Sequence, residues 1–212
     1  MVVRPPLRSR VTLLTGLVTL ACVVFAPFAS ARPRTEVVLA TSAEDPVLQA
    51  RMAQLSPGVD PKEARQVVFT SYTLGRQLAR EWRMSSSANW QCFLVNMGAR
   101  KAGYCYQFAN ELLLELDALK LRTLELHWAE ADPGTDIEHN VIVVTAKGQP
   151  FDQGILLDNW RRSGRLLWSP VTGDTMYLWK ENKPELARRL QWRHHYARHA
   201  PVTKPKSKDS RG

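Results

Sequence analysis

The spacing of apolar residues changes from helical to strand-like near residue 120, and this order limits what the chain can fold into. Before that point, two long segments at about 61–83 and 104–119 repeat apolar residues at helical intervals. After it come short alternating or β-branched runs, separated by turns rich in Gly, Pro and Asp. Helices followed by an antiparallel meander predict the α+β class, with the N-terminal helices packed on one side of an antiparallel β-sheet.

Individual elements follow from local signals. Asp60 is a helix cap, Pro61 suits the first helical position and Glu63 lies three residues after the cap, so a strong helix begins here. A weakly patterned lead-in at 32–57 precedes it, with a short helix near 46–55. Another short helix is expected at about 89–97. Strands are expected at 123–129, 137–145, 154–160, 165–168 and 176–179.

The first 31 residues have the pattern of an export signal. Three arginines precede an apolar run at 11–25, and Ala29-Ser30-Ala31 offers small residues for cleavage. Two alternatives remain open, because the uncharged stretch 11–31 is long enough for a membrane anchor and Cys22 is a candidate for lipidation. We expect an exported protein, periplasmic or secreted, with 1–31 as signal peptide or N-terminal anchor.

The formal net charge of +9 lies at the two ends of the chain. Residues 1–31 contribute +3 and residues 183–212 contribute +7, whereas 32–182 holds 17 basic and 18 acidic residues. A neutral middle argues against a nucleic-acid partner for the folded part. The basic C-terminal tail, 183–212, is expected to be partly disordered and is a candidate contact for anionic lipid or a cell-envelope polymer. No zinc spacing, phosphate loop or dinucleotide fingerprint is present, so we expect no metal and no cofactor.

Three residues have the properties of a thiol catalytic site. A nucleophilic cysteine acts as its thiolate, a form favoured by a helix N-terminus, a nearby cation and a general base. Cys105 lies in the first turn of the second strong helix, after Gly103, which permits a tight turn. His139 begins a β-branched strand, and Asp158 ends an apolar one. Neighbouring strands can bring His139 and Asp158 together, facing the start of the Cys105 helix.

The segments around these residues resemble a known family. Gly103–Ala109 resembles the nucleophile helix of the transglutaminase-like superfamily, within the papain-like thiol enzymes. Glu138–Val143 is similar to that family's His-bearing strand, and Leu157–Trp160 to its strand ending in Asp. The resemblance covers about 89–168 and places a transglutaminase-like domain at 58–182.

The resemblance implies a papain-like core and a catalytic triad. Cys105 would attack a carbonyl and form an acyl thioester, His139 would move the proton, and Asp158 would orient His139. We therefore expect a hydrolase or acyltransferase, of the cysteine peptidase or amidase kind, acting on a protein or peptide-like amide. Hydrolysis is favoured over cross-linking, since water is the default acceptor in an exported setting.

The residues that support this chemistry are less well defined. The backbone N–H of Cys105 is one donor for an oxyanion, and the side-chain donor is open between Trp90, Gln91 and Asn96. Trp128 and Trp160 are expected to border the substrate. Two other functions stay open: a non-catalytic binding module on the same fold, and a structural cell-envelope protein in which Cys92 and Cys105 form a disulfide.

Overall fold

A computed structural model describes residues 38–39, 43 and 45–199 of this chain. The expectations for the export signal or anchor, for Cys22 and for the tail beyond residue 199 lie outside these residues. Among the described residues, no helix has both the length and the apolar character needed to cross a membrane. The helices are α1 (Pro46–Ala53), α2 (Pro61–Glu81), α3 (Ala88–Asn96), α4 (Cys105–Ala118) and α5 (Lys183–His199).

The strands form one antiparallel sheet in the order β1-β5-β4-β3-β2-β6. They are β1 (Val38–Leu39), β2 (Leu124–Ala131), β3 (His139–Ala146), β4 (Ile155–Asp158), β5 (Leu167–Pro170) and β6 (Lys180–Glu181). The predicted α+β class is therefore confirmed. Four of the five predicted strands are present with shifted ends, and these are β2, β3, β4 and β5.

The predicted strand at 176–179 is wrong. This segment is irregular, and the next strand is β6, which pairs with β2 instead. Tyr177 and Trp179 explain the difference, because their rings pack against the imidazole of His139 at centroid distances of 4.9 and 5.4 Å. A segment whose side chains cover a sheet face in this way does not extend the sheet edge.

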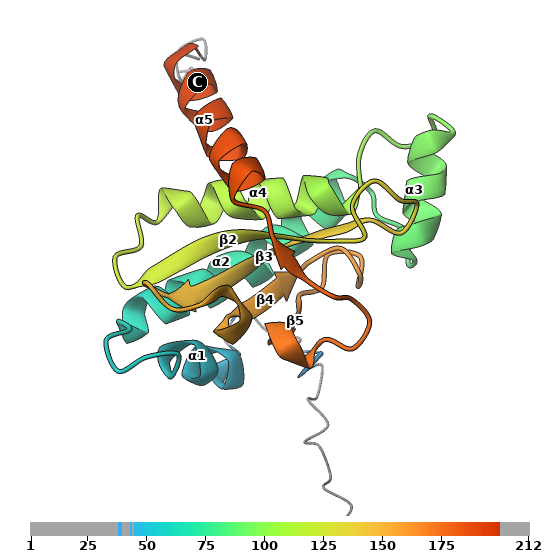
Figure 1. Cartoon of the computed structure of the whole chain (residues 1–212). Helices are drawn as coiled ribbons and strands as arrows, with labels where there is room; N and C mark the ends of the chain where they lie inside the picture. The colour runs from blue at the N-terminus through green and yellow to red at the C-terminus, as the bar shows by residue number, and fades with distance from the viewer. Residues whose placement is uncertain (1–37, 40–42, 44, 200–212) are drawn as a thin grey trace, which may run out of the picture. The chain divides into compact units, whose positions relative to one another are not determined.

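The helices cover one face of the sheet. Side chains of α1, α2 and α4 form the main core together with the alternate strand residues Leu124, Trp128, Ile142, Val144, Leu157 and Trp168. Figure 1 shows α4 running alongside β2 and β3. The opposite face carries a smaller apolar cluster, which includes Val141, Val143 and Leu156 and is covered by Val171 and Trp179. The sheet is thus buried on both faces, which explains why all eight residues of β3 are buried.

The folded unit extends beyond the predicted limits of 58–182 on both sides. In the supposed lead-in, Leu48 and Met52 of α1 are fully buried in the core. Asp45 caps α1 and accepts hydrogen bonds from Tyr72 and Trp168, joining the helix to the body. The start of the supposed tail is α5, whose Leu186 and Leu190 pack on the same core. A few apolar side chains anchor each segment to the core, and they do not form a long periodic pattern in the sequence.

Strand register explains how the predicted His–Asp pair forms. Ile142 of β3 lies opposite Leu157 of β4, so Asp158 comes level with Val141. Alternate residues of a strand share a face, which puts His139 on the same face as Val141 and therefore as Asp158. The pairing of these two strands thus brings the imidazole beside the carboxylate.

Candidate active site

Cys105 is the first residue of α4, where the sequence predicted a nucleophile. The turn into the helix is built by Gly103, whose φ of +132° disfavours other residues. The side chain of Gln107 accepts hydrogen bonds from the backbone N–H groups of Gly103 and Tyr104, at 2.8 and 3.0 Å. These bonds satisfy donors ahead of the first turn and fix where the helix begins.

The loop before Cys105 is held by Gln91, one of the predicted oxyanion donors. Its side chain is fully buried, and its amide nitrogen donates to the carbonyls of Ala102 and Trp82 at 2.9 and 3.3 Å. Its amide oxygen accepts from the N–H of Ser85. The amide group is therefore engaged by three backbone groups, an arrangement that suits a structural clamp.

The other two predicted donors lie near the same loop. Asn96 accepts a hydrogen bond from the hydroxyl of Tyr104. Trp90 is 53% exposed and stacks on Phe93, at a centroid distance of 4.9 Å. Neither contact is directed to the Cys105 sulfur. An oxyanion-donor role for Asn96 or Trp90 therefore stays a prediction.

His139 and Asp158 form a buried pair. Nε2 of His139 lies 2.7 Å from Oδ2 of Asp158, and the two side chains are 0% and 1% exposed. The imidazole is packed among three aromatic rings, those of Trp160, Tyr177 and Trp179. Contact with the carboxylate fixes the ring's orientation, as the third member of a triad does.

Asp158 has a further side-chain partner that the sequence analysis did not identify, Arg161, which in turn binds Asp174. Arg161 donates to Oδ2 of Asp158 through Nε and to Oδ2 of Asp174 through Nη2, both at 2.5 Å. Asp174 also accepts from the indole N–H of Trp179. The i, i+3 spacing of Asp158 and Arg161 could have indicated their pairing from the sequence. Asp174 lies in a separate segment, and no sequence pattern points to its contact with Arg161.

The turn that carries these groups is pressed against α2. A Cβ at Gly75 would lie 2.7 Å from both the Asn159 side chain and the carbonyl oxygen of Gly164. Gly164 has a φ of +92°, and a Cβ there would lie 2.3 Å from that of Ala79. Asn159 adds a hydrogen bond to the carbonyl of Ser71 at 3.1 Å. The backbone of α2 is therefore in direct contact with the backbone of the turn that follows β4.

The electrostatics of the buried pair favour a charged imidazole. Burial alone would lower the pKa of His139, but the carboxylate of Asp158 outweighs it and, with a smaller contribution from Cys105, raises the pKa to about 9. Burial would likewise raise the pKa of Asp158, but His139 and then Arg161 hold that pKa well below its usual range. An imidazolium is what a neighbouring thiolate needs as its counter-ion.

The sulfur of Cys105 lies at the start of β3. Its thiol donates to the backbone carbonyl of Glu138 at 3.7 Å, and the side-chain amide of Asn140 lies 3.9 Å from Sγ. Nδ1 of His139 is buried and has no hydrogen-bond partner. Because Nε2 is engaged by Asp158, Nδ1 is the ring nitrogen that would exchange a proton with a neighbouring group.

Both described cysteines are free thiols. The structure therefore does not contain the disulfide required by the structural alternative. Burial, together with the charge of Cys105, raises the pKa of Cys92, and a hydrogen bond involving Trp160 acts in the opposite direction. The net effect disfavours the thiolate form of Cys92.

The two tryptophans predicted to border the substrate have different surroundings. Trp160 is half-buried, lies against His139, and donates through its indole N–H to the carbonyl of Gly103 at 2.9 Å. Trp128 is only 1% exposed and donates to the side-chain oxygen of Asn140 at 2.9 Å. Trp160 thus connects His139 to the loop that precedes Cys105. Trp128 is buried and contacts the side chain of Asn140.

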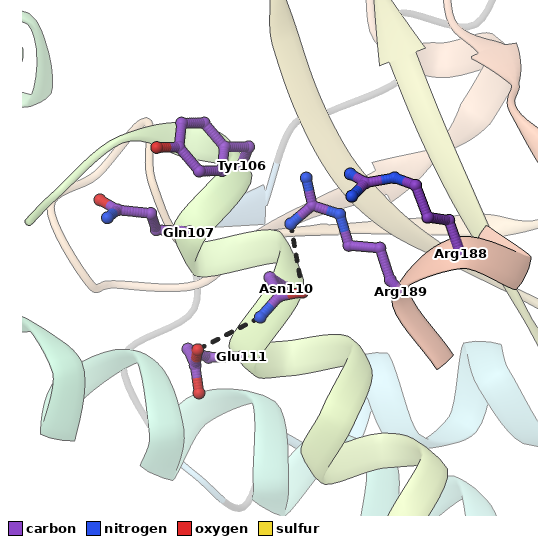
Figure 2. Close-up of a pocket in the computed structure, with 6 residues that line it drawn as sticks. All are labelled: Tyr106, Gln107, Asn110, Glu111, Arg188 and Arg189. Atoms are coloured by element: carbon purple, nitrogen blue, oxygen red, sulfur yellow. Dashed lines mark hydrogen bonds between the residues drawn. The ribbon is translucent and has the colours of Figure 1, made fainter. Parts of the chain in front are cut away.

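Two hollows flank Tyr106, the residue after Cys105. One is lined by Glu130, Glu138, Asn140 and Arg189, among others. The second lies between α4 and α5, where Figure 2 shows the Arg189 guanidinium directed to Asn110 of α4. The first hollow is lined by Asn140, whose side-chain amide lies 3.9 Å from the Cys105 sulfur.

No group of three or more His, Cys, Asp or Glu residues in the described part of the chain is arranged to hold a metal ion. Comparison with family models, with curated proteins and with solved structures finds no match to this chain.

Proposed function

We propose that this protein is a thiol enzyme of the transglutaminase-like kind that cleaves or transfers an amide-type acyl group. The proposal is carried by one arrangement: a cysteine at the first position of α4, beside a buried His139–Asp158 pair on neighbouring strands. The order of Cys, His and Asp along the chain, and the helix-then-sheet architecture, agree with the papain-like core that the sequence resemblance implies.

The proposed reaction has two steps. His139 takes the thiol proton, and the sulfur of Cys105 bonds to the substrate carbonyl carbon to give a tetrahedral intermediate. As the carbon–nitrogen bond breaks, the amine leaves with the proton from His139, and a thioester remains on Cys105. Water, deprotonated by His139, then attacks the thioester and releases a carboxylic acid and the thiol. An amine in place of water would give transfer instead.

Substrate class and location follow from the sequence. A protein or peptide-like amide supplies the carbonyl, and the pattern of 1–31 supports export to the periplasm or the outside of the cell. A non-catalytic binding module is the alternative, and it requires that Cys105 be chemically ordinary.

Alkylation of the intact protein tests this proposal. At about pH 6, iodoacetamide is expected to modify Cys105 at least roughly tenfold faster than a thiol in an unstructured peptide, because the imidazolium and the helix terminus favour the thiolate. The His139→Ala variant is expected to lose that advantage. Rates are measured by mass spectrometry of the peptides that contain Cys92 and Cys105.

The Cys92→Ser variant is the matched control for this experiment. Its Cys105 should be alkylated at the rate of the unchanged protein, because Cys92 has no part in the proposed reaction. A Cys105 no faster than the peptide thiol, or a rate that His139→Ala leaves unchanged, contradicts the thiol-enzyme proposal.

A further inference from the structure

We infer that Asn140 supplies the side-chain hydrogen bond that stabilises the oxyanion when Cys105 attacks a carbonyl. This inference rests on the proposed function, and it assigns the donor to a residue that the sequence analysis did not consider for this role.

The orientation of the Asn140 amide is fixed by its neighbours. The indole N–H of Trp128 can only donate, so the atom that lies 2.9 Å from it is the amide oxygen of Asn140. The NH₂ group must then point the other way. One acceptor of that group is Oε1 of Glu138 at 3.0 Å, and the other is the sulfur of Cys105 at 3.9 Å. Asn140 is 5% exposed, so water does not replace these contacts freely.

The two N–H bonds of this amide are unequal. The bond to Glu138 has an ordinary length, whereas the contact with sulfur is long and weak. During attack, the carbonyl carbon bonds to sulfur and its oxygen lies one bond further out, within reach of a donor that already faces the sulfur. An oxyanion there is a stronger acceptor than the thiol, so the contact strengthens as charge develops.

Strand geometry separates the base from the donor. His139 and Asn140 are consecutive residues of β3, so their side chains leave opposite faces of the strand. The sulfur of Cys105 lies at the strand's start, next to the carbonyl of Glu138. The amide of Asn140 approaches the sulfur at 3.9 Å from one face of the strand, and the charge of Cys105 acts on His139, whose side chain is on the other face. The N–H of Cys105, which has no acceptor within its own helix, is placed to be the second donor.

Trp128 acts through Asn140 as a positioning residue. The guanidinium of Arg189 lies over its ring at 4.3 Å and is itself held by Glu185 and Asn110, at 2.6 and 3.1 Å. Figure 2 shows the contact of Arg189 on α5 with Asn110 on α4. Together with the Arg189–Glu185 bond, it holds the guanidinium against the indole of Trp128. This indirect role for Trp128 differs from the predicted substrate contact, which stays a prediction.

Two reactions of the same sulfur separate this role from others. Alkylation by iodoacetamide displaces iodide and forms no oxyanion, whereas acylation by p-nitrophenyl acetate passes through one. In Asn140→Ala, acylation of Cys105 is expected to slow by about 10²- to 10³-fold. Alkylation should change by less than about threefold, because the imidazolium and the helix terminus remain. In Trp128→Phe, acylation should slow by roughly tenfold with alkylation again retained, because the amide loses the bond that orients it.

Each possible result either supports or contradicts the proposed role of Asn140. Equal losses in both reactions would show that Asn140 merely supports the thiol, and unchanged acylation would show that it has no role. If Asn140→Ala does not fold, as judged by circular dichroism, Trp128→Phe decides alone, and an unchanged acylation-to-alkylation ratio overturns the inference. Failure of the proposed function looks different, because Cys105 of the unchanged protein would then alkylate like a peptide thiol.

Discussion

Replacing Asp158 by asparagine is expected to slow acylation of Cys105 by about 10⁴-fold while leaving the side-chain shape unchanged. The carboxylate is what keeps the buried imidazole charged and correctly oriented. With a neutral amide in its place, burial lowers the pKa of His139, and the thiol loses both its base and its counter-ion. Acylation by p-nitrophenyl acetate at neutral pH measures the loss.

Asp174→Asn is the matched control. Asp174 shares Arg161 with Asp158, and its side chain is also buried. Its bonds are to Arg161, to Trp179 and to the backbone N–H of Met176, and none is to the imidazole. It should therefore lose stability without a comparable loss of acylation. If the two variants lose acylation to the same degree, the effect comes from the buried network as a whole and Asp158 has no special role towards His139.

The same pair predicts how stability depends on pH. The pKa of His139 is raised to about 9 from an unfolded value near 6.5, so its contribution to stability is complete below about pH 6.5 and is lost as pH rises through about 9. The pKa of Asp158 is lowered, so its contribution is present above about pH 4 and is lost on acidification. In Asp158→Asn the first trend should reverse, because a buried imidazole without its carboxylate resists protonation. Urea unfolding at several pH values measures both trends.

Arg161→Met is expected to lower the free energy of unfolding by about 3–5 kcal/mol, the range for removing one partner of a buried ion pair. Arg161 is 8% exposed and holds two carboxylates that are 1% and 0% exposed. Without the guanidinium, Asp174 loses its only ion-pair partner among the described residues. The imidazole becomes the only ion-pair partner of Asp158 there, which keeps its hydrogen bonds from the backbone N–H groups of positions 160 and 161. Chemical denaturation gives the size of the effect.

Two further variants interpret that result. Arg161→Lys should recover only part of the stability, because an ammonium group does not match the forked geometry that joins both carboxylates. Arg188→Met removes an arginine that is 55% exposed and paired with Glu185, and should cost less than about 1 kcal/mol. Comparable losses in Arg161→Met and Arg188→Met would contradict the assignment of the buried network.

The sequence predicted the helices well because their signals are local. Asp60, Pro61 and Glu63 mark the start of α2, and the structure begins that helix at Pro61 with Asp60 as its cap. The adjacency of His139 and Asp158 was also predictable, since each lies at the end of an apolar run and such runs become neighbouring strands. The start of α2 is encoded in a few consecutive residues, and the His139–Asp158 contact in two apolar runs that pair as strands.

What the sequence did not reveal depends on contacts between distant segments. Asp174 meets Arg161 only because the segment before β6 folds over the sheet, and the strand predicted at 176–179 missed this cover. In the sequence, Asn140 is an ordinary strand residue. The orientation of its amide group can be inferred only when the positions of Trp128 and Cys105 are known. Contacts of this kind between separate segments leave no periodic pattern in the sequence.

The close approach of Gly75 and Gly164 means that the position of the turn after β4 depends on the middle of α2, a helix that contributes none of the three candidate site residues. A methyl group at Gly75 would push on Asn159 and Gly164, and so would shift the turn that begins at Asp158. Substitution in α2 is therefore constrained by the turn that follows the buried His139–Asp158 pair, although neither residue of that pair lies on this helix.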